Sequence, residues 1–192
     1  PPYNIGFNYK GGYKDNIKEE NYNILIKELL EYSFNLSNDT ANMFLINYPE
    51  IIANLFETIK TTDWNIHQWI NWVYPTNVGH SKRKFTRAGR TILWLTKDNP
   101  KIYIDRVLQP YKNINDKRIK ENIANGRTGT HLYDWWEINL VKNVSKQKQN
   151  YTNQIPQELL KRLIFTTTDE LDLVVDPMCR AGSTLITATI LN

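Results

Sequence analysis

The sequence predicts a single α/β domain, and three observations support this class. Its 192 residues are 41% hydrophobic and 23% charged, which suits one domain with a substantial core. Short apolar runs rich in β-branched residues, typical of buried strands, occur between segments with helical spacing of apolar residues. Residues 172–186 then read as a strand, a tight turn at Ala181-Gly182 and a helix capped by Ser183 or Thr184.

The junction at 172–186 is the stretch where we expect a ligand. Such a turn directs backbone N–H groups and the positive end of the helix dipole toward the carboxyl end of the strand, where open α/β sheets bind nucleotides. Asp176, at the strand tip, is placed to accept a hydrogen bond from a ligand amine or hydroxyl. An ordinary strand-to-helix turn gives the same pattern, so features elsewhere in the chain must show whether this turn binds a ligand.

Composition sets the remaining bounds. A formal net charge of +4 and a pI near 9.0 favour a polyanionic partner only weakly. Cys179 is the single cysteine, which excludes an internal disulfide and a cysteine zinc cluster, and with no signal peptide pattern a reducing cytoplasm is expected. No run is long enough to cross a membrane, and His67, His80 and His131 lack metal-ligand spacing, so we expect neither membrane nor metal.

The chain opens with Pro1-Pro2-Tyr3, a rigid turn. Two prolines fix φ twice and remove two donors, which leaves carbonyl oxygens beside an aromatic ring. This arrangement suits a flat ring with an amino group, whose hydrogens would go to a carbonyl and whose face would stack on Tyr3. A disordered terminus with two chance prolines is the alternative.

Helices and strands are then expected in alternation. The predicted segments are a helix over 17–34, a strand over 43–46, a helix over 49–59, and strands over 64–74 and 91–96. The apolar stripe of the first helix is Ile24, Leu25, Leu29, Leu30 and Phe34. A further helix is expected from Pro156 to Ile164.

Two stretches are unusually polar. Residues 81–90 carry five cations and no acid, and we expect phosphate contact by Lys82, Arg83, Lys84 and Arg87, against the alternative of a solvated loop. From 108 to 148 the periodic pattern is lost, and Trp135, Trp136 and Ile138 are expected to anchor this segment to the core.

Together, Pro1 to Gly6 and Asp176 to Thr184 resemble the two motifs of the amino-DNA methyltransferases, the S-adenosylmethionine-dependent enzymes that methylate adenine N6 or cytosine N4. Their catalytic motif is Asp/Asn/Ser-Pro-Pro-Tyr/Phe, and their cofactor motif often reads Asp-Pro-Phe/Met-Cys-Gly-Ser/Ala-Gly-Thr/Ser-Thr. With the catalytic motif first, the order is similar to that of the permuted β class. The resemblance implies a Rossmann-like methyltransferase fold with a mixed, mostly parallel sheet, helices on both faces and an incomplete C-terminal part.

The resemblance also implies that Tyr3 and the Asp176–Gly182 turn lie at the same rim of a single sheet, and it implies an organisation and a set of roles. One domain would comprise a catalytic half (1–107), a target-recognition insert (108–150) and the start of a cofactor-binding half (151–192). The implied catalytic residues are Pro1, Pro2 and Tyr3. The implied S-adenosylmethionine contacts are Asp176, Pro177, Met178, Gly182, Ser183, Thr184 and Gln154.

The implied reaction moves a methyl group to a base swung out of double-stranded DNA, with adenine N6 preferred because Pro-Pro-Tyr-Asn-Ile-Gly resembles the adenine enzymes. A second copy of the chain or a restriction enzyme is a further expected partner. An alternative is a degenerate or fragmentary relative that binds DNA without catalysis. A Rossmann oxidoreductase has little support, because neither Gly-x-Gly-x-x-Gly nor a phosphate-loop motif is present.

Three departures from the family pattern bear on activity. The polar residue before Pro1 is absent, and the chain stops at Asn192 before the strand whose acidic tip would hold the ribose hydroxyls. Arg180 replaces the first motif glycine, where a bare backbone lets the cofactor approach. Its side chain is expected either to obstruct the cofactor or to pair with the cofactor's carboxylate.

Overall fold

A four-stranded sheet forms the centre of the computed structural model, which describes residues 1–8, 14–75, 82–142, 145–149 and 153–191. In spatial order its strands are β3 (Asn42–Asn47), β5 (Gly89–Thr96), β4 (Asn65–Val73) and β8 (Trp135–Glu137). β5 runs antiparallel to both β3 and β4, whereas β8 is parallel to β4. The sheet is mixed as expected, but antiparallel pairing predominates among its described strands. The reason is that β5 returns directly from β4 and inserts between two strands that run in the same direction.

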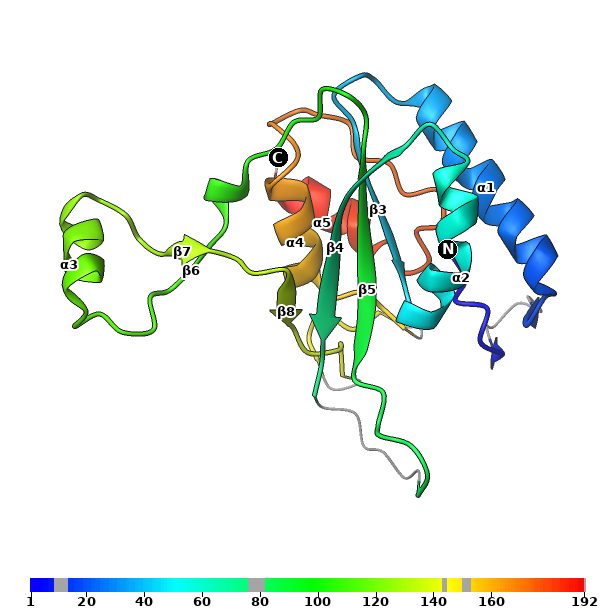
Figure 1. The fold of residues 1–192 in the computed structure, drawn as a ribbon, viewed down its shortest axis with the longest axis horizontal. Helices are drawn as coiled ribbons and strands as arrows, with labels where there is room; N and C mark the ends of the chain where they lie inside the picture. The colour runs from blue at the N-terminus through cyan, green and yellow to red at the C-terminus, as the bar shows by residue number, and fades with distance from the viewer. Residues whose placement is uncertain (9–13, 76–81, 143–144, 150–152, 192) are drawn as a thin grey trace.

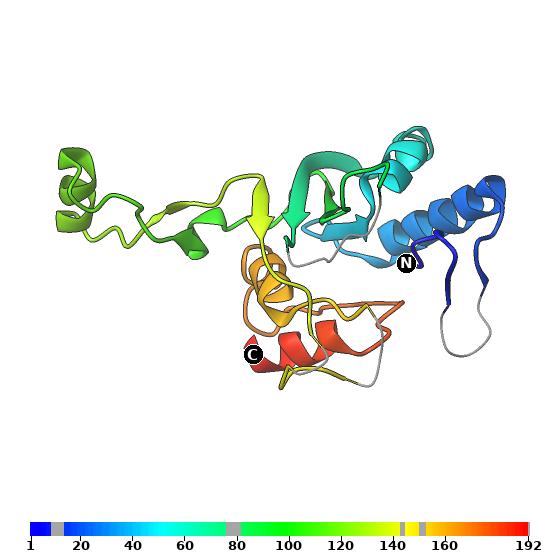
Figure 2. The same ribbon diagram turned by 90° about the horizontal axis from the view of Figure 1, so that it is seen from below.

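Helices cover both faces of the sheet, as the sequence predicts (Figures 1 and 2). Alternate residues of β5 face opposite sides, because side chains alternate along a strand. Leu93 and Leu95 pack with α1 (Glu19–Leu36) and α2 (Pro49–Lys60), whereas Ile92 and Trp94 pack with α4 (Gln157–Phe165). The last helix, α5 (Ser183–Leu191), lies against α4.

The expected apolar stripe of α1 is largely confirmed, because Leu30 is buried and Leu25, Leu29 and Phe34 pack against the core. The fully buried side chains of the helix are Tyr22, Ile26 and Leu30, whereas Ile24 is 57% exposed. The helix is therefore rotated toward the row that starts at Tyr22, whose hydroxyl is bonded to the first residues of the chain. That tertiary bond has no signature in apolar periodicity.

The strand expected at 172–176 does not form. Its backbone pairs with none of the described strands, and Leu173 and Val175 are 87% and 70% exposed. Without a neighbouring strand, an extended segment has no ladder to complete and no second layer to pack against. The turn and the helix that follow it are present as predicted.

The polar segment after residue 107 is an arm that projects from the body (Figures 1 and 2). A short ribbon of β6 (Leu108–Gln109) and β7 (Thr130–His131) forms its root, and α3 (Lys117–Ala124) its tip. At Gly129 a Cβ atom would collide with the Gln109 carbonyl, so the two chains of the root cross where only glycine fits. No helix was predicted at α3. Its N-terminus nevertheless has a favourable cap, because Asp116 accepts a hydrogen bond from the Arg118 N–H (2.9 Å).

The anchoring of the arm is largely as expected. Trp136 and Ile138 are 7% and 3% exposed within the core between the sheet and α4, whereas Trp135 is 45% exposed. The smaller described elements are β1 (Phe7–Asn8), β2 (Lys14–Asp15) and the 3₁₀ helix η1 (Ile104–Arg106). No helix over the described ranges combines the length and apolar character needed to cross a bilayer.

Candidate active site at the rim of the sheet

The two motif-bearing ends of the chain meet. The Arg180 Nη2 donates a hydrogen bond to the Pro1 carbonyl (2.9 Å), and its guanidinium carbon lies 4.9 Å from the centre of the Tyr3 ring. The meeting point lies at the edge of the sheet where β3 and β4 end and β5 begins. Asn47, at the end of β3, is linked to Pro2 through Tyr22, and Arg90, near the start of β5, contacts the Tyr3 ring. The expectation that Tyr3 and the 176–182 turn share one rim of the sheet is confirmed.

The Pro1-Pro2-Tyr3 turn is held by distant elements. The Tyr22 hydroxyl, on α1, donates to the Pro2 carbonyl (2.6 Å) and accepts from the Asn47 side-chain amide (2.8 Å). The Asp15 carboxylate accepts hydrogen bonds from the two backbone N–H groups that follow Tyr3 (2.8 and 3.2 Å). The Pro2 carbonyl is thus used by the fold, and the Pro1 carbonyl is the one that faces Arg180.

The Tyr3 ring is only 2% exposed. Tyr48 meets it edge-on with ring centres 5.3 Å apart, and the guanidinium carbon of Arg90 lies 4.6 Å from its centre. Burial raises the pKa of Tyr3, and the positive charges of Arg90 and Arg180 oppose that rise. In this arrangement the ring expected to stack on a base is covered.

Arg90 is a part of the site that the sequence did not single out. It is 3% exposed and lies 5.1–5.5 Å from the centres of three further rings, those of Tyr48, Trp72 and Tyr74. Burial lowers its pKa, but the neighbouring tyrosines raise it more, and the net shift is upward. The Nε and Nη1 atoms are buried without a hydrogen-bond partner, so cation–π contacts stabilise much of this group. Strand alternation is the signal that could have found it, since Arg90 shares a face with Ile92 and Trp94.

The cofactor-motif turn is held mainly by its own atoms. The Asp176 carboxylate accepts hydrogen bonds from the Thr184 hydroxyl (2.6 Å) and the Met178 N–H (3.1 Å). Gly182 has φ +68°, which favours glycine, and Arg180 has φ +37°. The Ser183 hydroxyl, at the start of α5, is buried without a hydrogen-bond partner. Pro177 lies exposed between these groups.

Gln154 is buried, but its amide is committed to the chain itself. It donates to the Gln147 carbonyl (2.7 Å) and accepts from the Gln149 N–H (2.8 Å). In this structure it fixes the backbone before α4 and presents no free amide to a ligand. Its role as a cofactor contact stays a prediction.

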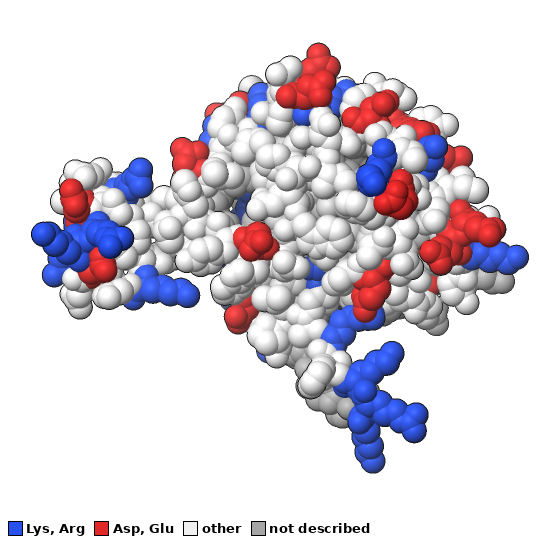
Figure 3. Space-filling model, viewed as in Figure 1, with Lys and Arg blue, Asp and Glu red and all other residues white. Residues whose placement is uncertain are grey.

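The basic stretch divides into a tip and a base. Lys82, Arg83 and Lys84 are exposed between β4 and β5. Figure 3 shows Lys and Arg side chains gathered at the end of a projection from the body. Residues 76–81, with His80, lie outside the described residues. Arg87, nearer the rim, bonds Glu50 (2.8 Å) and lies 4.5 Å from the centre of the Tyr48 ring. The expected phosphate contacts are therefore spread over differently placed cations.

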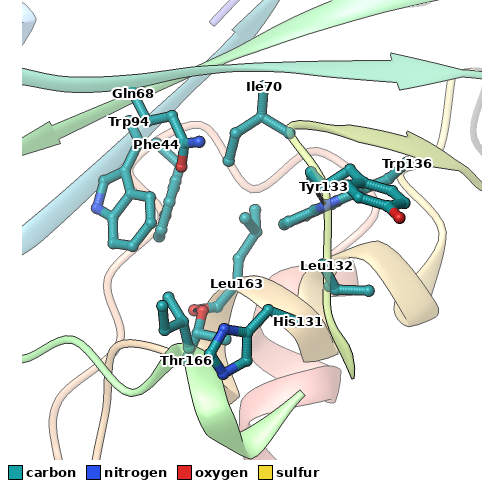
Figure 4. Close-up of a pocket in the computed structure, with 11 residues that line it drawn as sticks. Phe44, Gln68, Ile70, Trp94, His131, Leu132, Tyr133, Trp136, Leu163 and Thr166 are labelled. Atoms are coloured by element: carbon teal, nitrogen blue, oxygen red, sulfur yellow. Dashed lines mark hydrogen bonds between the residues drawn. The ribbon is translucent and has the colours of Figure 1, made fainter. Parts of the chain in front are cut away.

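A separate cavity of about 130 Å³ lies at the root of the arm (Figure 4). Its lining residues come from the sheet, from the β7 end of the arm and from α4, among them Phe44, Ile70, Leu132 and Leu163. Pockets for small molecules usually exceed about 300 Å³, so we interpret this cavity as a gap in packing. Over the described residues, no three His, Cys, Asp or Glu side chains are grouped in a way that could hold a metal ion.

Comparisons with known proteins identify the family of this chain. A family model described as DNA methylase matches residues 1–192. Type II methyltransferase M.HpaI of Haemophilus parainfluenzae is 25% identical over 190 residues, which are 95% of this chain and 56% of the relative. DNA adenine methyltransferase YhdJ of Escherichia coli K12 is 22% identical, with 95% of this chain and 63% of the relative covered.

Solved structures share the fold. PvuII DNA methyltransferase, named as cytosine-N4-specific, superposes with a TM-score of 0.69 at 12% identity, covering 95% of this chain and 67% of the other. The M1.HpyAVI–SAM complex gives 0.60 at 16% identity, covering 86% and 71%. The chain spans little more than half the length of M.HpaI. Because the family model covers the whole sequence, this chain belongs to the DNA methylase family of N6 and N4 amino-methyltransferases.

Proposed function

We propose that this protein transfers a methyl group from S-adenosylmethionine to the exocyclic amine of a base flipped out of double-stranded DNA, adenine N6 in preference to cytosine N4. The supporting observation is the meeting of the Pro1 carbonyl and the Tyr3 ring with the Asp176–Ser183 turn through Arg180. Methyl transfer needs its two substrates side by side, and these segments are where the family motifs would hold them.

The groups present suit the amino-acid end of S-adenosylmethionine. The unpartnered Ser183 hydroxyl, the N–H groups at the start of α5 and the Arg180 guanidinium are donors for its carboxylate. Asp176 supplies carboxylate oxygens for its ammonium group or for the hydroxyls. Pro177, Met178, Gly182 and Thr184 shape the turn between them. When bound, the cofactor supplies an electrophilic methyl group on a sulfonium.

The base end of the site has two tasks. An exocyclic amine is a weak nucleophile because its lone pair is delocalised into the ring, and a hydrogen bond from its N–H to the Pro1 carbonyl localises that pair. Stacking on Tyr3 stabilises the base outside the duplex, where unstacking costs roughly a few kcal/mol. The Pro2 carbonyl is bonded to Tyr22, so the Pro1 carbonyl is the acceptor proposed for the base.

Radiolabelled S-adenosylmethionine and mixed-sequence duplex DNA test the reaction. Digestion of the DNA to nucleosides should yield labelled N6-methyladenine, and Tyr3→Ala should lower the incorporation at least tenfold. Tyr32→Ala is the control, since Tyr32 lies on α1 and is 67% exposed. Labelled N4-methylcytosine alone would refute the adenine assignment.

Binding of DNA without catalysis is the second candidate, and one observation favours it. Tyr3 is covered, and Arg180 occupies the Pro1 carbonyl. This candidate predicts no labelled base and no heat on titration with S-adenosylmethionine, together with retained affinity for DNA. Either candidate suits a cytoplasmic protein that works beside a restriction enzyme, as the type II names of its relatives suggest.

The exposed cations of the loop are proposed to contact DNA phosphates. Removal of one phosphate-binding cation should reduce the slope of log K against log salt by about 0.9, so Lys82/Arg83/Lys84→Gln should reduce it by about 2.7. A control triple, Lys27/Lys60/Lys161→Gln, removes equal charge from α1, α2 and α4 and should leave the slope unchanged. Equal slopes for the two triple variants would refute the phosphate contacts.

A further inference from the structure

Arg180 occupies both groups that a captured base requires. Its Nη2 bonds the Pro1 carbonyl at 2.9 Å, and its guanidinium carbon lies 4.9 Å from the Tyr3 ring centre. The Pro1 carbonyl is the acceptor proposed for the amine, and Tyr3 is the ring proposed to stack on the base. A base and the Arg180 side chain therefore compete for the same two partners.

Capture of a base requires some neighbour of Tyr3 to withdraw, because that ring is only 2% exposed. Arg90 is poorly suited to withdraw, since it is 3% exposed, surrounded by aromatic rings and placed in the ladder between β4 and β5. Arg180 is half-buried on a turn that pairs with no described strand. Of the two guanidinium groups on this ring, Arg180 is the one that can leave without disrupting the sheet.

The backbone at Arg180 also indicates that its side chain has a specific task. Its φ of +37° lies in the left-handed region, where a glycine would be unstrained and an arginine is not. The contacts with the Pro1 carbonyl and the Tyr3 ring offset this strain in the absence of ligand. A partner that pulls the guanidinium away must therefore replace those contacts with comparable ones.

An anion beside α5 is such a partner. The buried Ser183 hydroxyl without a hydrogen-bond partner and the start of α5 lie three residues after Arg180, so a carboxylate bound there would attract the guanidinium. On the proposed function, that anion is the carboxylate of S-adenosylmethionine. We infer that Arg180 is a positioning residue that covers the base site until the carboxylate binds, so that base capture depends on the cofactor.

Two measurements test this coupling. The first is calorimetric titration with S-adenosylmethionine and with its decarboxylated analogue. The unaltered protein should prefer the carboxylated form at least tenfold, and Arg180→Gly should reduce that preference at least threefold. Arg180→Met removes the charged guanidinium and its donors but keeps a side chain on the same backbone, and it should act in the same direction, which guards against a backbone effect.

The second measurement does not require methyl transfer. A duplex carries 2-aminopurine at the position along the DNA where the radiolabel is found. The fluorescence of 2-aminopurine rises when that base leaves the stack. With the unaltered protein the fluorescence should rise at least threefold only after cofactor is added. With Arg180→Gly it should rise without cofactor. Arg162→Met, which removes a guanidinium from α4, should behave like the unaltered protein.

The outcomes separate this inference from the proposed function. If bases are methylated but fluorescence rises without cofactor in the unaltered protein, the inference is wrong and the proposed function stands. An unchanged carboxylate preference in both Arg180 variants also overturns it. If no base is methylated and no cofactor binds, the proposed function fails and the inference fails with it.

Discussion

The two turns that meet at the rim are built in opposite ways. The Pro1–Tyr3 turn is bonded to α1, to Asp15 and, through Tyr22, to the end of β3. The Asp176–Gly182 turn closes mainly on itself through the Asp176 carboxylate, and the segment before it exposes its apolar side chains. A non-glycine residue at positive φ nevertheless lies directly after the first turn and within the second, Asn4 and Arg180 respectively.

This difference shows how one site can combine a fixed part with an adaptable part. The first turn cannot shift without breaking bonds to the core, so on the proposed function it fixes where a base would lie. The second keeps its shape by short-range bonds, so on the inference drawn above it is the part that adjusts when Arg180 withdraws. An adaptable turn carrying Arg180 is what the proposed coupling requires.

The largest expected contrast is between two leucines. Leu45→Ala, in β3, should lower the free energy of unfolding by about 2–5 kcal/mol, because Leu45 is 1% exposed in the core. Leu173→Ala should change it by less than about 0.5 kcal/mol, because Leu173 is 87% exposed. Urea unfolding of both variants measures the contrast, and equal losses would show that residues 172–176 are packed in solution.

A smaller effect is expected at the bond that ties the first turn to the core. Tyr22→Phe removes the donor to the Pro2 carbonyl and the acceptor of the buried Asn47 amide. The loss should be about 1–3 kcal/mol, because buried polar groups are left unpaired. Tyr32→Phe on the same helix should be neutral in the same denaturation experiment. A neutral Tyr22→Phe would mean that packing alone holds this turn.

The self-closing turn should depend on its own hydroxyl. Thr184→Val keeps the shape but removes the donor to Asp176, and should cost about 0.5–1.5 kcal/mol. Thr189→Val is the matched control, because Thr189 is exposed on the same helix and its hydroxyl donates to the Leu185 carbonyl one turn earlier. Thermal unfolding would contradict this picture if the two variants lost equal stability.

The least pronounced effect concerns pH. Hydrogen bonds from Arg106, Tyr103 and Lys101 hold the pKa of Asp169 well below its usual range, and Lys101 similarly lowers that of Asp172. The folded state favours the charged carboxylates, so their stabilisation is present above the unfolded pKa near 3.8 and is lost as pH falls further. Asp169→Asn should flatten the fall in Tm below about pH 4. A Tm profile as steep as that of the unaltered protein would exclude the Asp169 carboxylate as the cause.

The sequence correctly predicted the parts of the fold that depend on residues close together in the chain. The glycine at 182, the helix that begins after it and the apolar spacing of α2 act over a few residues, and the structure has these elements. The predicted cap of α5 is wrong, because the Ser183 hydroxyl has no hydrogen-bond partner and the Thr184 hydroxyl donates to Asp176. The two motifs also placed the ends of the chain together, because each motif implies a position at the same rim.

The predictions failed where contacts between residues distant in the chain determine the structure. The rotation of α1 follows a tertiary bond at Tyr22, and the segment at 172–176 has apolar residues suited to a strand but no partner among the described strands. In the sequence, Arg90 is one of five cations in a polar stretch. Its position in β5 directs its side chain toward aromatic rings, among them those of Tyr3 and Trp72. Nothing in a charge count distinguishes a cation on a loop from one that enters the next strand.

The crossing at Gly129 has a consequence for how such proteins diversify. Since only glycine fits against the Gln109 carbonyl, the direction in which the arm leaves the body is fixed by the backbone at its root. Residues 110–128 are bounded by that root and make their contacts beyond it. On the prediction that this arm is the target-recognition insert, the tip could be replaced by another of different length and charge, which would change the DNA sequence that is read and leave the rim of the sheet unaltered.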